Sequence, residues 1–167
     1  EIIRHSPHDG DAYEQYGHDL DRVCQAIKPL LDMAPPDIFS DDPEELVAPI
    51  PPAMEPATVR TVAIHALMAG CKPEYLPVVL GAVKHIVREE FNMGGVQCTM
   101  HGVAPLMIVN GPYAEKIGLY GGPGCFGPGF RANTSIGRAI RLMLLNLGGG
   151  ISGRASATVF SSPFRYS

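Results

Sequence analysis

The chain has few cysteines, no strongly basic region and no long apolar run, and each shortage argues against a class of protein. Its 167 residues include four cysteines, at positions 24, 71, 98 and 125, and no two of them form a C-x-x-C pair. Such scattered cysteines favour reduced thiols and a cytoplasmic protein over a disulfide framework. No apolar stretch approaches the roughly 18 residues that a membrane span needs. We therefore expect no membrane partner.

Charged residues make up 18% of the chain and hydrophobic residues 46%, which is typical of a soluble globular protein. The net charge of −4 is uneven, because residues 1–46 carry −9 and residues 47–167 carry +5. The basic part is too weakly charged to indicate a nucleic-acid partner. The contrast divides the chain into an acidic helical segment with a linker, 1–46, and an α+β domain, 47–167. We expect that domain to be truncated at its C-terminus.

The hydrophobic pattern predicts helices in the first half of the chain. Apolar residues at helical spacing predict an amphipathic helix over 9–33, with Ser6 as its N-cap. Prolines and acids over 34–56 then predict an extended linker. Two further helices, 57–69 and 72–90, are expected to form an αα-hairpin around Gly70.

The second half mixes strand and helix patterns. Residues 96–110 alternate and then run apolar, which predicts a buried strand, and residues 157–160 predict a last strand. Between them we expect a short helix over 113–117 and a long one over 133–147. The predicted fold class is α+β, with one small mixed sheet packed by the αα-hairpin and the long C-terminal helix.

A glycine-rich loop before the long helix is the most informative stretch. Gly122, Gly124 and Gly127 let backbone N–H groups approach a ligand, and the helix behind them adds the positive end of its dipole. The flanking residues are not those of a dinucleotide fingerprint or a P-loop, so no recognisable motif encodes a cofactor.

Polar residues at the start of the long helix strengthen this interpretation. Arg131, Asn133, Thr134 and Ser135 bring a guanidinium, an amide and two hydroxyls to the orphan N–H groups of the first turn. A carboxylate or a phosphate would suit such a site. The alternative is a self-capped helix beneath a tight glycine loop.

Cys71 is the strongest signal from a single residue. It follows the glycine that ends one predicted helix, and it precedes Lys72 at the start of the next. A thiol in that position should have a lowered pKa and act as a nucleophile or redox thiol. The alternative is a small apolar residue that fills a tight corner.

His101 and Glu55 are candidate acids or bases. His101 lies where the predicted strand breaks at a glycine, so it could transfer protons, or simply form a hydrogen bond at a strand end. Glu55 could do the same, or complement a helix dipole. Cys98 and His101 lack a metal-ligand spacing, so we expect no metal. His65 and His85 lie inside predicted helices, where packed or solvated side chains are usual.

Three strings within residues 51–167 carry a resemblance to a known family. They are PPAMEPATVRTVAIHALMAGCKPEYLPVVLGAV, HGVAPLMIVNGP and FGPGFRANTSIGRAIRLMLLNLGGG. They resemble the poorly characterised bacterial domain associated with UGSC-type (seleno)proteins, although the Cys-Gly-Ser-Cys redox motif of that name does not occur in this chain. The positions that match that pattern in type are Glu55, Cys71, Lys72, Glu74, His101, Asn110, Arg131 and Asn133.

The acidic segment has a different resemblance. The string SPHDGDAYEQYGHDLDRVCQAIKPLLDMAPPD is similar to an internal helical segment of phytoene-dehydrogenase-like FAD oxidoreductases. The flavin-binding βαβ unit of those enzymes is not in this sequence, so the resemblance implies no FAD function here. Together, the two resemblances suggest a fusion with its junction near 44–50.

Two functions are consistent with these observations. The first is a thiol-dependent enzyme or enzyme subunit that acts on a small anionic metabolite, with Cys71 as nucleophile or redox thiol and His101 or Glu55 as acid or base. Its anion would be held by Lys72, Asn110, Gly124, Gly127, Arg131, Asn133 and Ser135. The second is a non-catalytic binding or scaffold module that forms a homo-oligomer or pairs with a redox partner protein. A buried Cys71 and a loop closed on its own backbone would favour the second.

Overall fold

The computed structural model describes residues 42–127 and 129–157, together with Gln15, His18, Asp21, Arg22 and Gln25. By its internal contacts the chain divides into two units, Glu1–Pro35 and Pro36–Ser167. The five described residues of the first unit are helical and exposed. The rest of the helix predicted over 9–33, and the strand predicted over 157–160 beyond its first residue, lie outside the described residues. Within the described part, every helix is too short or too polar to cross a lipid bilayer.

The second unit begins with a β-hairpin, where the sequence predicted a linker. β1 (Leu46–Ile50) pairs antiparallel with β2 (Glu55–Thr58), and Pro49 lies opposite Pro56. Proline fits here because both strands of a two-stranded ribbon are edge strands, so a missing N–H need not break a ladder. The linker prediction over 34–56 is therefore wrong from residue 46 onward. The sheet of the described residues is antiparallel, and not mixed as predicted.

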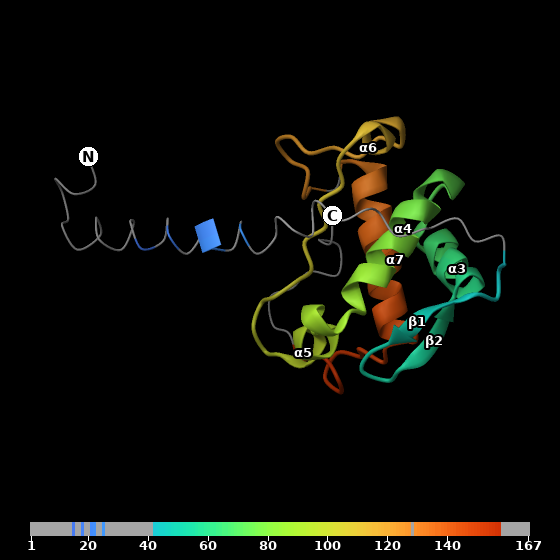
Figure 1. Cartoon of the computed structure of the whole chain (residues 1–167), viewed down its shortest axis with the longest axis vertical. Helices are drawn as coiled ribbons and strands as arrows, with labels where there is room; N and C mark the ends of the chain where they lie inside the picture. The colour runs from blue at the N-terminus through green and yellow to red at the C-terminus, as the bar shows by residue number, and fades with distance from the viewer. Residues whose placement is uncertain are drawn as a thin grey trace. The chain divides into compact units, whose positions relative to one another are not determined.

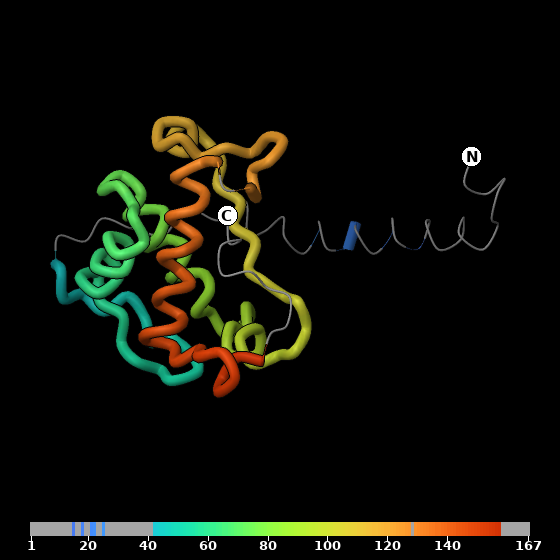
Figure 2. The backbone as a smooth tube through the Cα atoms, turned by 180° about the vertical axis from the view of Figure 1, so that it is seen from behind, coloured from blue at the N-terminus to red at the C-terminus, as the bar shows by residue number. Residues whose placement is uncertain are grey.

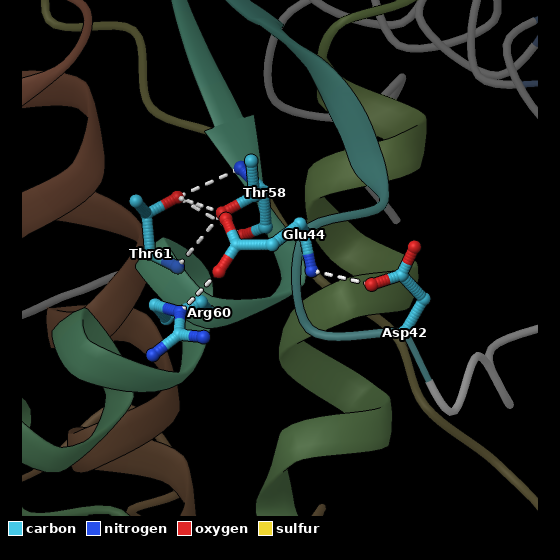
Figure 3. A network of polar contacts seen from close by, with 5 residues as sticks. All are labelled: Asp42, Glu44, Thr58, Arg60 and Thr61. Carbon is cyan, nitrogen blue, oxygen red and sulfur yellow. Dashed lines mark hydrogen bonds and ion pairs between the residues drawn. The ribbon is translucent and has the colours of Figure 1, made fainter.

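The hairpin leads directly into α3 (Val59–Ala69). Thr58 caps this helix in a reciprocal box with Thr61, whose N–H donates to the Thr58 hydroxyl while its own hydroxyl accepts from the Thr58 N–H at 2.8 Å (Figure 3). The Val59 N–H donates to the Glu45 carbonyl at 3.0 Å. The helix predicted over 57–69 is confirmed, with a start two residues later because its first two residues belong to β2.

The segment before β1 is held against the first turn of α3. The Arg60 side chain forms an ion pair with Glu44, and the Asp42 carboxylate accepts from the Glu44 N–H at 2.9 Å (Figure 3). Both partners of the ion pair are exposed, so we expect it to stabilise the fold by at most about 1 kcal/mol. The backbone holds this segment as well, because the Arg60 N–H donates to the Pro43 carbonyl at 2.8 Å.

Three helices form the body of the unit (Figure 1). α3 ends at Gly70, which adopts a left-handed conformation with φ of 87°, and a 3₁₀ turn, η1 (Pro73–Tyr75), leads into α4 (Leu76–Ile86). Both helices contact each other and α7 (Arg131–Asn146). The αα-hairpin and the long helix are thus confirmed, and with them the α+β class. The largest fully buried side chains are Ile50, Val62, Val79, Val83, Ile136, Met143 and Leu144.

The strand predicted over 96–110 is wrong. After η2 (Glu89–Phe91), its first residues belong to α5 (Met93–Cys98), which Asn92 caps by accepting from the Gly95 N–H. Residues 102–110 then run without regular secondary structure to α6 (Pro112–Lys116), where a short helix was predicted (Figure 2). A strand is defined by its partner, and sequence periodicity reports only the alternation of side chains.

The three glycines after α7 pack against the hairpin turn. A Cβ on Gly148 would lie 2.6 Å from the carbonyl oxygens of Leu144 and Pro51, and the Ala53 N–H donates to the Gly148 carbonyl. A Cβ on Gly150 would overlap Oε1 of Gln97. These glycines therefore permit a close approach of two backbones, in addition to ending the helix.

Candidate functional site

The Cys71 thiol lies in the tight corner between α3 and η1. The Cys71 N–H donates to the Ala66 carbonyl at 2.9 Å, so the residue continues the end of α3 after the left-handed Gly70. Its side chain is buried, with 8% of the residue exposed, and it belongs to the hydrophobic core. This is the environment of a small residue that fills a corner.

Burial raises the pKa of the Cys71 thiol, whereas the sequence predicted a lowered one. The Ser135 hydroxyl and the Arg131 charge act in the opposite direction, and they offset the burial only in part. The helix that was to activate the thiol begins with a three-residue 3₁₀ turn, and Lys72 is exposed. The expected thiolate is therefore disfavoured, because the charged form loses more by desolvation than it gains from its neighbours.

Arg131 joins this corner to the start of α7. Its Nε and Nη2 atoms both donate to the Gly70 carbonyl, at 3.2 and 3.0 Å. The structure thus brings together the two parts of the predicted site, the Cys71 corner and the start of the long helix. The same fork that would hold a carboxylate is, however, directed at a carbonyl of the chain itself.

Asn133 closes the glycine-rich loop onto the helix. This side chain is 4% exposed, its Oδ1 accepts from the Tyr120 N–H at 3.0 Å, and its Nδ2 donates to the carbonyls of Tyr120 (2.8 Å) and Cys125 (3.2 Å). The rings of Tyr120 and Phe130 stack across the base of the loop, with centroids 4.0 Å apart. Ser135 donates to the Arg131 carbonyl at 2.6 Å. Arg131, Asn133 and Ser135, which were predicted to bind an anion, therefore all form hydrogen bonds within the chain.

Two loop glycines serve this closure. Gly124 has φ of 82°, which strains any residue with a side chain, and its carbonyl accepts from the Gly127 N–H at 2.8 Å. A Cβ on Gly127 would lie only 3.0 Å from that carbonyl. The geometry is that of a tight loop bonded to itself.

Lys72 and Asn110 border the same end of the unit. Tyr113 of α6 donates through its hydroxyl to the Glu74 carbonyl at 2.7 Å, which ties α6 to the turn that follows Lys72. Asn110 precedes Gly111, whose φ of 92° turns the chain into α6. Lys72 and Asn110 are both exposed, and no described hydrogen bond directs either side chain toward Arg131.

Glu55 and His101 lie near the opposite end of α7. Glu55 follows the hairpin turn, and that turn is bonded to Gly148, beyond the last residue of α7. His101 lies four residues after Gln97, whose Nε2 donates to the Pro51 carbonyl of the same turn. Since α7 has 16 residues and spans about 24 Å, the structure does not bring these two candidates to Cys71.

His65 and His85 are held by structural hydrogen bonds. His65 is buried, its Nδ1 lies 2.7 Å from the Thr61 carbonyl, and its Nε2 lies 3.2 Å from Nδ2 of Asn146. Nδ1 therefore carries the proton, because Nε2 faces an amide donor. His85 makes a similar bond to Gly81. Within the described part of the chain, no three side chains of His, Cys, Asp or Glu are grouped so that they could hold a metal.

The sequence reasoning missed a second kind of feature, in the extended segment 102–110. Met107 packs against the core, whereas its neighbours Leu106 and Ile108 are each 62% exposed. The available signal was the lack of charge, because no Asp, Glu, Lys or Arg occurs from residue 91 to residue 114.

Comparisons with known proteins leave the family open. A scan against protein-family models, a search of curated proteins and a search of solved structures each found no match for this chain. The resemblances to the UGSC-associated domain and to FAD oxidoreductases therefore stay predictions.

Proposed function

We propose that this protein is a non-catalytic scaffold module that associates with a second copy of itself through the extended segment 102–110. The observation that carries the proposal is that this segment exposes apolar side chains at a place where its backbone makes no hydrogen bond with another described residue. Both features are costly in an isolated molecule, and both are relieved by a second chain.

The exposure of the segment alternates along the chain. From residue 104 to residue 110, exposed residues alternate with partly buried ones, which is the period of an extended strand. The inner residues Pro105, Met107 and Val109 are partly buried, and Met107 packs against the core cluster. The outer side presents Leu106 and Ile108 to solvent, at 62% exposure each. One side of the segment is therefore anchored, and the other is free to contact a partner.

Among the described residues, none from 102 to 110 makes a backbone hydrogen bond with another. Natural proteins usually protect such edges with charged side chains, with proline, or with a covering element. Here the nearest formal charges along the chain are Glu90 and Glu115. Two copies of the segment can face each other without opposing like charges of their own, whereas a charged peptide would gain no ion pair from the segment itself.

Oligomeric state tests the proposal. We expect the full chain to show a concentration-dependent dimer by light scattering coupled to size exclusion, and the double variant L106Q/I108Q to be monomeric over the same dilution series. The control is I64Q/L67Q, which removes two exposed apolar side chains (47% and 71%) from α3 and should leave the dimer intact. Both variants change exposed residues. The free energy of unfolding of each monomer should therefore differ from that of the wild-type monomer by no more than about 0.5 kcal/mol per substitution. A wild-type monomer at every concentration would overturn the proposal, and so would loss of the dimer in the α3 variant alone.

A thiol-dependent enzyme that acts on a small anion is the second candidate, because Cys71 lies beside Ser135 and Arg131. The test is the pH dependence of iodoacetamide alkylation in a C24S/C98S/C125S variant. Since burial raises the pKa of Cys71, we expect slow alkylation whose midpoint lies above the value of about 8.5 for a free cysteine. A midpoint well below that value would instead favour the enzyme.

A further inference from the structure

We propose that the two copies pair as antiparallel strands along one particular edge of segment 102–110, with the two-fold axis at Leu106. This inference rests on the proposed function and adds the edge, the register and the contacts of the interface. It follows from the position of a single proline and from the two bends that limit the segment.

The proline distinguishes the two edges of the segment. In an extended chain, successive residues direct their N–H and C=O groups to opposite edges. Residues 103, 105, 107 and 109 share one edge, and Pro105 removes a donor there. Residues 102, 104, 106, 108 and 110 share the other edge, and each of them retains its N–H. One edge thus lacks a donor at Pro105. The other keeps an N–H at every position, and none of these groups bonds to the backbone of another described residue.

Counting hydrogen bonds shows how strongly the second edge is favoured. A full antiparallel overlap of two segments through the proline-free edge can form about ten hydrogen bonds, two for each facing pair of bonded residues. The same overlap through the other edge can form about six, because each copy lacks the donor of Pro105. The proline-free edge is therefore the pairing edge.

The bends at the two ends of the segment determine the register. The extended run begins after a bend at His101 and ends at Gly111, where φ of 92° turns the chain into α6. A nine-residue run from 102 to 110 overlaps fully with its antiparallel copy only when residue 106 faces itself. Leu106 then faces Leu106 of the second copy, and Ala104 faces Ile108. A small side chain opposite a large one, beside a leucine pair, fills the outer face of the ribbon without a clash.

The edge is tested with two neighbouring proline substitutions. A104P removes an N–H from the pairing edge in both copies, and should raise the dimer dissociation constant at least about tenfold. V103P removes an N–H from the opposite edge and should leave that constant within about threefold of the wild type. Both residues are exposed, and neither makes a described backbone hydrogen bond within the copy, so the folded monomer should tolerate both changes. The reverse order of effects would overturn the assignment of the edge.

Single cysteines test the register, in a full-length chain that carries C24S, C98S and C125S. Under mild oxidation, L106C should form a disulfide-linked dimer, because the two copies of residue 106 face each other within the Cα separation of about 4.4–6.8 Å that a disulfide requires. I108C is the control, since its two copies would be four residues apart along the ribbon, about 13 Å, and beyond reach. Efficient linkage through I108C with little through L106C would overturn the register.

A wrong register and a wrong proposed function would give different results in these experiments. If light scattering finds a dimer that depends on Leu106 and Ile108 but L106C does not link, the register is wrong and the proposed function stands. If the wild type never dimerises, the proposed function itself fails. The cysteine in L106C replaces part of the apolar contact, so its linkage is compared with that of I108C at matched protein concentration, and not with the wild type.

Discussion

The glycine-rich loop, 120–130, and the extended segment, 102–110, flank α6 on either side in the sequence, and they differ in what they leave unsatisfied. The loop is rich in donors and acceptors, yet Asn133 and the Tyr120–Phe130 stack fasten it to the helix that follows. The extended segment consists almost entirely of apolar residues, yet its backbone has no partner among the described residues. The loop therefore has the residue types of a binding site. The segment has exposed apolar side chains, and its backbone groups have no hydrogen-bond partner among the described residues.

This difference shows how to weigh residue type against residue environment. A buried amide with all its contacts made stabilises a fold, because leaving any of its partners unpaired would cost free energy. An exposed leucine next to free N–H and C=O groups does the opposite, since it raises the free energy of the isolated chain until a partner covers it. The ligand-like residues at the start of α7 thus support the loop, and the plain segment before α6 is the stronger candidate for an interface.

The largest expected effect tests the closed loop. Replacing Asn133 by alanine removes three hydrogen bonds and leaves the N–H of Tyr120 and the carbonyls of Tyr120 and Cys125 without that partner. We expect a loss of about 3 kcal/mol in the free energy of unfolding, measured by urea titration. N133D keeps the acceptor but directs a buried carboxylate oxygen at the carbonyls of Tyr120 and Cys125, so it should destabilise the fold at least as much as alanine.

The matched control for that experiment is Asn110→Ala, on the other side of α6. Asn110 is exposed, and no described hydrogen bond uses its side chain, so the same change should cost no more than about 0.5 kcal/mol. If both asparagines proved equally dispensable, the loop would not be closed by Asn133. The backbone amides of the loop would then be available to an anion, as the sequence suggested.

The parts of the fold that local chemistry determines could be predicted from the sequence. Gly70 ended α3 as expected, because only glycine readily adopts its φ of 87°, and the apolar spacing defined α4 and α7. The β-hairpin could not be predicted in this way. Its prolines argue against strands in general, and they fit here only because Pro49 and Pro56 lie in a ribbon of two edge strands. That no described residue forms a backbone hydrogen bond with 102–110 is likewise a property of the folded chain and not of the segment.

The candidate site was predictable in part for the same reason. Helix starts and tight corners are local, so the sequence identified Arg131 and Cys71, and the structure places them together through the Gly70 carbonyl. Burial is not local, so the direction of the Cys71 pKa shift was predicted wrongly. Glu55 and His101 are separated from the thiol because their segments pack at the opposite end of α7 from Cys71. A local residue pattern does not show at which end of a helix a distant segment packs.

The smallest expected effect separates two neighbouring residues of the extended segment. Met107 packs on the core and Leu106 faces solvent, so M107A should lower the free energy of unfolding by about 1–2 kcal/mol, and L106A by no more than about 0.5 kcal/mol in dilute, monomeric protein. Thermal unfolding at several protein concentrations sharpens the contrast, because association raises the melting temperature of a folded state as concentration increases.

The melting temperatures of the wild type and of M107A should depend on concentration in the same way, with that of M107A lower throughout. L106A should melt near the wild type when dilute and gain less on concentration, because it has lost only the contact with the second copy. If L106A instead followed the wild type at every concentration, the exposed side of the segment would carry no interface, and the contrast with the closed loop would reduce to one of packing alone.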